Sequence, residues 1–127
     1  MIRFRAWNKA TKEVHEDDDI IAINFEEKQI CVKTLFFDQL NHYDFDDVVL
    51  MQSTGFRDKN GKEIFEGDIL NYKGKKALVT WHGSYASFIY RFVGESQKRN
   101  PEWDPLYLAY MKCEIVGNIW EDGELLD

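Results

Sequence analysis

The sequence predicts a mainly β protein, with at most the minor helix of an α+β fold, built from small twisted sheets. Three observations support this class. The chain is rich in aromatic residues, with nine Phe, six Tyr and four Trp among 127 residues, and aromatic side chains favour strands. Short segments alternate apolar and polar residues with the period of two that strands require. Turn signals separate these segments at close spacing, which is typical of a sandwich or a partly open barrel.

Length and composition narrow the class of protein further. A chain of 127 residues and 15.1 kDa is predicted to form one domain, residues 1–127. Within it we expect a subdivision into an N-terminal β-hairpin segment, 1–47, and a barrel-like segment, 48–127. With 44% hydrophobic and 31% charged residues, the composition excludes a membrane protein and a disordered one. The sequence has no signal-peptide pattern and no apolar run of about 18 residues, so a cytoplasmic location is expected.

The N-terminal segments are predicted in chain order. Residues 2–7 alternate apolar and basic or aromatic side chains and should form a strand, and residues 8–12 should form a turn. After an acidic block, residues 20–25 and 30–34 are predicted to form a hairpin around the polar turn 26–29. Residues 35–43 fit either a strand or one helical turn, so both structures remain open there.

The C-terminal segments predict the barrel, which we expect to be SH3-like. A strand over 48–52 is followed by Asn60–Gly61, a pair that tolerates the positive φ of a tight type I′ turn. Residues 106–111 and 114–120 should form closing strands after a loop over 94–105, and 121–127 an acidic end. Between these two regions the sequence predicts three strands joined by the short turns 73–76 and 82–84, namely residues 69–72, 77–81 and 88–93.

The net charge of −7 is unevenly distributed along the chain. Residues 1–53 carry −5, residues 54–112 carry +3, and residues 113–127 carry −5. The acidic total argues against a protein wholly devoted to wrapping nucleic acid or anionic lipid. The basic middle nevertheless leaves room for a local anion-binding surface.

No familiar catalytic or metal-binding pattern is present in the sequence. His15, His42 and His82 lack metal-ligand spacing, and no nucleophile elbow or phosphate-binding glycine loop occurs. We therefore predict no catalytic residue, no metal ligand and no cofactor. The Asp blocks at 17–19 and 44–47 could hold magnesium for hydrolysis, but this is the least favoured reading. Cys31 and Cys113 are too few for a disulfide framework and are expected to be buried thiols.

The positive signal lies where aromatic and basic residues are interleaved between residues 73 and 99. Small β-barrels use this combination to bind single strands, because rings stack on bases and cations contact phosphates. In a strand pattern half of the aromatic residues must point into the core, so packing is favoured over binding. The candidate binding face comprises Lys75, Lys76, Trp81, Tyr85, Tyr90, Arg91 and Trp103.

Three stretches of the sequence resemble the YopX family of phage and prophage proteins. The first is the opening Arg3–Asn8, with the sequence RFRAWN. The central and most specific stretch is Leu50–Leu70, which reads LMQSTGFRDKNGKEIFEGDIL. The third is Glu114–Asp122, EIVGNIWED. They occur in the family's order and span the chain.

This resemblance implies a mostly β, phage-associated YopX-like domain with no established enzymatic activity, substrate or cofactor. It implies structural roles for the motif residues, which should lie at turns where glycine permits positive φ or a close backbone approach. Asp58 and Asp68 are expected to accept hydrogen bonds from turn amides. The motif turn residues are Gly55, Asp58, Asn60, Gly61, Gly67, Asp68, Gly117 and Asn118.

The leading functional hypothesis is a non-enzymatic accessory protein that acts through protein contacts or self-association. Exposed aromatics such as Trp103 or Tyr107 would make those contacts, because interfaces are enriched in Tyr and Trp. The alternative is a nucleic-acid-binding small β-barrel module that uses residues 73–99. No membrane partner is expected.

Overall fold

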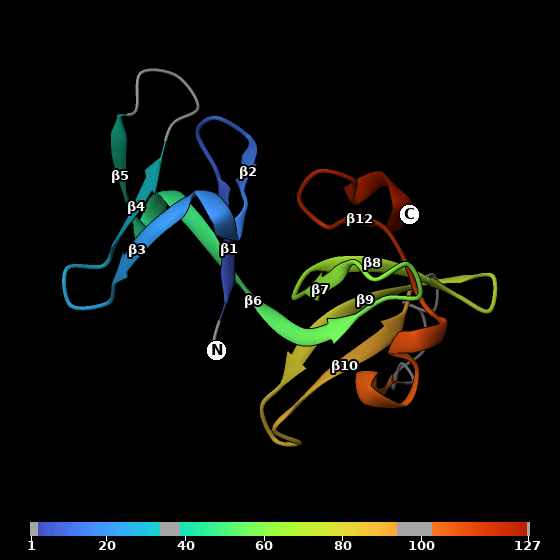
Figure 1. Cartoon of the computed structure of the whole chain (residues 1–127). Helices are drawn as coiled ribbons and strands as arrows, with labels where there is room; N and C mark the ends of the chain where they lie inside the picture. The colour runs from blue at the N-terminus through green and yellow to red at the C-terminus, as the bar shows by residue number, and fades with distance from the viewer. Residues whose placement is uncertain (1–2, 34–38, 94–102, 127) are drawn as a thin grey trace. The chain divides into compact units, whose positions relative to one another are not determined.

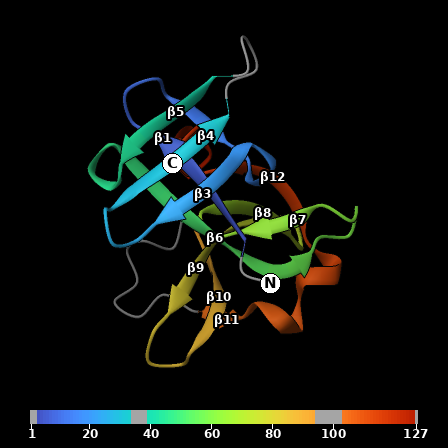
Figure 2. The same ribbon diagram turned by 60° about the vertical axis from the view of Figure 1, so that its left-hand side comes forward.

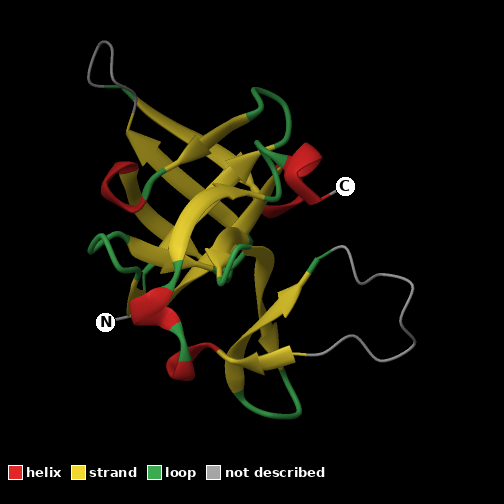
Figure 3. Ribbon diagram, turned by 90° about the vertical axis from the view of Figure 1, so that its right-hand side faces the viewer, coloured by secondary structure: helices red, strands yellow, loops and turns green. Residues whose placement is uncertain are grey.

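The computed structural model describes residues 3–33, 39–93 and 103–126. It divides the chain into two units, Met1–Gln52 (unit 1) and Ser53–Asp127 (unit 2). The long strand β6 (Val48–Arg57) begins in unit 1 and ends in unit 2 (Figure 1). Strands dominate both units and helices are limited to short 3₁₀ turns (Figure 3), so the predicted mainly β class with minor helix is confirmed.

Unit 1 contains two antiparallel sheets. In the first, β1 pairs with β2 on one side and with the N-terminal part of β6 on the other. In the second, β3, β4 and β5 pair in chain order, which confirms the predicted hairpin and adds a third strand (Figure 2). The elements are β1 (Phe4–Asn8), β2 (Glu13–His15), η1 (Asp17–Asp19), β3 (Ile20–Asn24), β4 (Gln29–Lys33), β5 (Leu40–Asp44) and η2 (Phe45–Asp47).

The core of unit 1 is formed by one apolar face from each sheet. Ala6, Ile30, Val32 and Val48 are all buried in one cluster. Asn8 is fully buried at the end of β1, where its Oδ1 accepts hydrogen bonds from the backbone N–H groups of residues 10 and 11. The last residue of the opening RFRAWN stretch therefore shapes the turn that was predicted over 8–12.

Unit 2 contains an open antiparallel sheet in the order β11-β10-β9-β8-β12, with β11 and β12 at its edges. The short strand β7 pairs instead with the C-terminal part of β6. The elements are β7 (Glu63–Phe65), β8 (Asp68–Tyr72), β9 (Lys75–His82), β10 (Ser87–Phe92), β11 (Trp103–Pro105), η3 (Leu106–Leu108), η4 (Tyr110–Lys112), β12 (Glu114–Asn118) and η5 (Gly123–Leu126).

The predicted strand over 106–111 is wrong, because the chain forms the 3₁₀ helices η3 and η4 there. Leu106, Ala109 and Cys113 are buried and pack in the core of unit 2. Their spacing of three and four residues is helical, not alternating. Most of the intervening positions are also apolar, so the sequence pattern does not show which period applies.

Two further segments differ from the prediction or complete it. Residues 103–105 belong to strand β11, whereas a loop was expected there; the rest of the predicted loop, 94–102, lies outside the described residues. In the segment left open between strand and helix, β5 is a strand and 34–38 lie outside the described residues. Cys31 and Cys113 are buried free thiols, as predicted.

The loop between β6 and β7 is organised by one carboxylate. Asp58 Oδ1 accepts hydrogen bonds from the backbone N–H groups of Asn60 and Lys62, each at 2.9 Å. Asp58 Oδ2 accepts a third from the N–H of Ile115, 57 positions away, at 3.0 Å. The carboxylate therefore shapes its own loop and also holds the start of β12.

The type I′ turn predicted at Asn60–Gly61 is wrong. That turn needs positive φ at both central residues, and here Gly61 has φ of 82° while Asn60 is not among the positive-φ residues. Five residues, 58–62, separate the paired residues Arg57 and Glu63. The N–H groups of Asn60 and Lys62 donate to Asp58 Oδ1 and stabilise this longer loop, which removes the need for a tight turn.

A second network closes the C-terminal end of β12. Asn118 Oδ1 accepts hydrogen bonds from the N–H groups of Trp120 and Glu121, and the Asn118 N–H donates to Asp122 Oδ2 at 3.1 Å. Gly117 lies directly against this turn: a Cβ placed there would come within 2.6 Å of Asp122 Oδ2. Glycine is required here by close approach.

Replacing Asp58 with alanine should destabilise unit 2 by about 3 kcal/mol at pH 7, because it removes the acceptor of three backbone N–H groups around a buried position. Burial alone would raise the pKa of Asp58, but the N–H groups of Ile115, Lys62 and Asn60 and the charge of Lys62 lower it below its usual range. A lowered pKa adds stability above the unfolded value of about 3.9, and this stability is lost as the pH falls through the folded value.

Urea denaturation at pH 7 and pH 3 measures both effects. The wild type should lose more stability on acidification than Asp58→Ala, while the exposed control Asp18→Ala should stay within about 0.5 kcal/mol of wild type at pH 7. Equal stability of Asp58→Ala and Asp18→Ala would contradict the role of this carboxylate.

Gly117→Ala should destabilise the protein by about 1–3 kcal/mol, because the added methyl group must displace the Asp122 side chain from the Asn118 N–H. Gly123→Ala is the matched control, since a Cβ there meets nothing within 4 Å. Thermal unfolding of both variants should show a lower Tm for Gly117→Ala alone; equal Tm values would rule out the close approach.

Candidate functional site

Strand pairing sorts the aromatic and basic side chains of β9, β10 and β11 onto two faces of the sheet. Successive residues of a strand point to opposite faces, and directly paired residues share a face. Val79 pairs with Tyr90, and both are buried in the core of unit 2. Leu78 pairs with Arg91, and Arg91 pairs with Trp103, so these residues lie on the opposite face.

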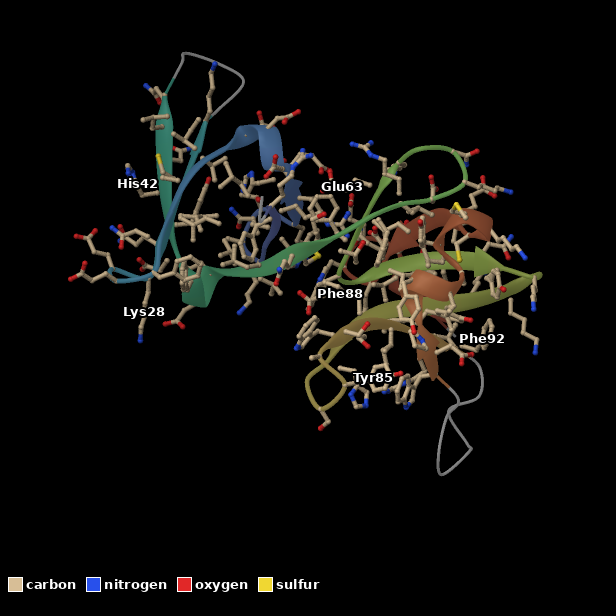
Figure 4. The ribbon with its side chains drawn as sticks, turned by 60° about the horizontal axis from the view of Figure 1, so that its bottom comes forward. Lys28, His42, Glu63, Tyr85, Phe88 and Phe92 are labelled. Carbon is tan, nitrogen blue, oxygen red and sulfur yellow. The ribbon has the colours of Figure 1, made fainter. Side chains whose placement is uncertain are left out.

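We call this opposite side the Trp103 face and define it by Lys76, His82, Tyr85, Arg91 and Trp103. Lys76 and His82 alternate with the core residues of β9, and Tyr85 lies in the β9–β10 turn (Figure 4). Arg91, Lys76 and Tyr85 are exposed, and Tyr85 keeps 52% of its surface accessible. Four of the predicted binding residues, Lys76, Tyr85, Arg91 and Trp103, are therefore placed on one side of the sheet.

Three rings form a cluster on the Trp103 face. The ring centroids of His82 and Trp103 are 4.6 Å apart at an interplanar angle of 35°. Tyr85 meets Trp103 edge to face, with centroids 5.2 Å apart and an angle of 68°. The Tyr85 N–H also donates to His82 Nδ1 at 3.2 Å, which fixes the turn against the histidine ring. Trp103 is thus partly folded onto the sheet and half-buried.

His82 is the member of this cluster that sequence reasoning missed. The sequence shows only that His82 lacks the spacing of a metal ligand. The available signal was local: His82 ends a predicted strand three residues before Tyr85, and a turn of that length brings the two side chains together. The contact of His82 with Trp103 has no local signal, because the two residues are 21 positions apart.

The remaining members of the predicted face lie elsewhere. Tyr90 is 5% exposed and belongs to the core, so its ring is not available to a ligand. Trp81 packs edge to face on Phe88, with centroids 5.0 Å apart, on the core side of the sheet close to the β9–β10 turn. Lys75 lies over the Phe92 ring at 5.4 Å. Figure 4 labels Phe88 and Phe92, the two aromatic partners on β10.

Burial changes the acidity of two core side chains in unit 2. It raises the pKa of the Tyr90 hydroxyl to about 12, with further contributions from Asp104, Tyr72 and Cys113. It also raises the pKa of the Cys113 thiol to about 11, with a contribution from Asp58. The Cys113 thiol donates a hydrogen bond to the Ala109 carbonyl at 3.2 Å. A thiol that stays protonated is a poor nucleophile.

The turn residues of the three sequence stretches lie apart from the Trp103 face and have structural roles. Asp68 Oδ2 accepts the Phe65 N–H at 2.8 Å, at the turn between β7 and β8. Gly67 has a positive φ of 87° at the turn between β7 and β8. Gly55, predicted to lie at a turn, has a φ of 81° inside β6 where the register with β7 shifts, because a bulge also needs a positive φ. The Asp58, Gly61, Gly117 and Asn118 contacts described above have structural roles of the same kind, at loops and strand ends.

Two other properties concern the described parts of the chain. Within residues 3–33, 39–93 and 103–126, no group of three or more His, Cys, Asp or Glu side chains is placed to hold a metal ion. None of the helices described is long and apolar enough to cross a membrane.

Comparison with known proteins identifies the family. The family model described as YopX protein matches residues 3–127. The chain belongs to the YopX family. This match confirms the resemblance seen in the sequence, and it covers both structural units.

Two solved structures share the YopX fold with this chain. Protein EF1440 from Enterococcus faecalis is 25% identical, with a TM-score of 0.68 and coverage of 100% of this chain and 99% of that one. Protein yopX from Bacillus subtilis is 20% identical, with a TM-score of 0.62 and coverage of 98% of each chain. A search of curated proteins found no match.

Tyr90→Phe should make the protein less sensitive to alkali. A raised pKa means that the folded state holds the phenol proton more tightly, so this stability is present below the unfolded pKa of about 10 and is lost as the pH rises through 12. Urea denaturation at pH 8 and pH 11 should show a smaller loss for Tyr90→Phe than for wild type. Tyr107→Phe, at an exposed phenol, should lose as much as wild type; the same loss in all three proteins would rule out Tyr90 as a source.

Proposed function

We propose that this YopX protein is a non-enzymatic accessory protein, encoded by a phage or prophage and acting in the bacterial cytoplasm through protein contacts, including contacts with a second copy of itself. Membership of the YopX family supports the phage association. The observation that supports protein contacts is a group of exposed apolar side chains on η3 and η4.

The outward side of η3 and η4 carries three large apolar residues, which we call the 107–111 patch. Tyr107, Leu108 and Met111 are 53%, 63% and 70% exposed, respectively. The inward side of the same segment is already satisfied, because Leu106 and Ala109 are buried in the core. The three patch residues therefore do not contribute to the core of unit 2 and remain exposed at its surface.

The chemistry of the patch suits a protein surface as its partner. Single exposed apolar residues are common on protein surfaces, but several large ones side by side indicate an interaction site. Tyr and Met are both enriched in interfaces, and the flexible thioether of Met adapts to different partner shapes. Leu106 in η3 is buried, and so are Ala109 and Cys113 on either side of η4, so the patch is presented without a large ordering cost.

Substituting Leu108 and Met111 together by serine should abolish self-association and leave the fold intact, because both side chains are largely exposed. Sedimentation equilibrium should show the wild type shifting above its monomer mass of 15.1 kDa at high concentration, whereas the double variant should remain a monomer. Leu40→Ser, at a residue that is 53% exposed in unit 1, is the matched control and should associate like wild type.

A second experiment tests for a protein partner by placing a photo-crosslinking amino acid at position 111 in the phage-carrying host. Contact with a host or phage protein should trap a defined adduct that the Leu108→Ser background removes. A wild-type protein that stays monomeric at every concentration and forms no adduct would contradict the proposal.

A further inference from the structure

We propose that the Trp103 face binds single-stranded nucleic acid, with Tyr85 and Trp103 stacking on bases and with Arg91 and Lys76 contacting phosphates. This inference goes beyond the protein contacts proposed above and concerns other residues than the 107–111 patch. It rests on three features of the face: accessible rings, neighbouring cations and a suitable length.

Tyr85 and Trp103 form an aromatic corner in which Tyr85 is exposed and Trp103 is half-buried. Tyr85 and Trp103 stand at 68° to each other with centroids 5.2 Å apart, so a base stacked on one ring meets the edge of the other. His82 lies at 35° against the Trp103 indole and limits its rotation. Because the rings already pack on each other, little side-chain freedom is lost when a ligand binds.

The cations lie beside the rings and on the same side of the sheet. Arg91 is directly opposite Trp103, and Lys76 lies diagonal to Arg91 across the β9–β10 pair. The nearby carboxylate of Asp104 belongs to the other face, because Asp104 pairs with Tyr90. Lys73 and Lys75 lie over the rings of Tyr72 and Phe92, which belong to the core side, so Arg91 and Lys76 are the cations that the Trp103 face uses.

The length of the face suits a short strand of nucleic acid. From Lys76 to His82 the six steps of β9 span about 20 Å at about 3.3 Å per residue. At about 3.4 Å per nucleotide, a strand of about six nucleotides covers this distance. That length falls within the range of about 4–16 nucleotides seen for small barrel domains. The rings at one end and Lys76 at the other place stacking and charge along one track.

A single strand fits this face better than a duplex or an acidic peptide. Stacking on a ring needs an unstacked base, which a duplex does not offer. An acidic peptide could use the cations but has no flat group for the corner between Tyr85 and Trp103. The chain's net charge of −7 opposes long-range attraction, so binding must come from contacts on this face.

Fluorescence anisotropy with a labelled oligothymidine of about 12 nucleotides tests the proposal on the full-length protein. Tyr85→Ala and Trp103→Ala should each weaken binding by about fivefold or more. The salt dependence of log K should have a slope near −1.4, corresponding to about 0.7 for each of two neutralised phosphates. The double variant Lys76→Gln/Arg91→Gln should flatten that slope.

Matched controls separate this face from the rest of the surface. Tyr107→Ala removes a ring that is 53% exposed, against 52% for Tyr85, and Lys112→Gln removes an exposed cation on η4; both should bind like wild type. An abasic strand of the same length keeps the phosphates and should bind much more weakly. Equal affinity for the abasic strand, for a duplex or for the Tyr85→Ala protein, or no binding at low salt, would overturn the proposal. Because Tyr107→Ala also disrupts the 107–111 patch, self-association and nucleic-acid binding can fail independently.

Discussion

The Asp58 carboxylate is the interaction on which the arrangement of unit 2 depends. Its two oxygens bind three backbone N–H groups, two within its own loop and one at the start of β12. The neighbouring Lys59 N–H donates to the Cys113 carbonyl at 2.9 Å, so the loop is joined to the end of η4 at a second point. These contacts hold segments that are far apart in sequence next to each other at the start of β12. The rest of β12 pairs with β8. Such a charge is tolerated at a buried position because every contact stabilises its ionised form.

Strand register determines which aromatic residues are available for binding. In unit 2 the alternation of β9 and β10 assigns Tyr90 to the core, while Trp103 and Arg91 share the other face. A shift of one residue would exchange these assignments. The binding proposal therefore depends on pairing as much as on composition, and the family turn residues act indirectly by fixing the strands.

The sequence predicted the class of the fold and most strands, because alternation and turn residues are local signals. It also predicted that Asp58 and Asp68 accept turn amides, which the structure confirms. It failed where local patterns were ambiguous or contacts were distant. Residues 106–111 are almost all apolar and show no period, and the loop containing Asn60 is stabilised by Ile115, a partner that no local rule can find. The structure places four residues of the candidate face, Lys76, Tyr85, Arg91 and Trp103, on one side of the sheet. Tyr90 lies in the core instead, because the sequence does not show which face of β10 is covered by the rest of unit 2.

Strand β6 passes from unit 1 to unit 2 without a linker, and this has a consequence for folding cooperativity. Residues 48–52 pair with β1, and residues 53–57 pair with β7. Loss of the pairing with β1 would leave residues 48–52 of β6 without their β1 hydrogen-bond partners. The unpaired segment would then end directly before Ser53, the first residue of unit 2. A protease that cuts near Gln52 would therefore damage both units, although it cleaves only one strand. Opening of either the β1–β6 or the β6–β7 pairing should therefore extend first into the rest of this one strand.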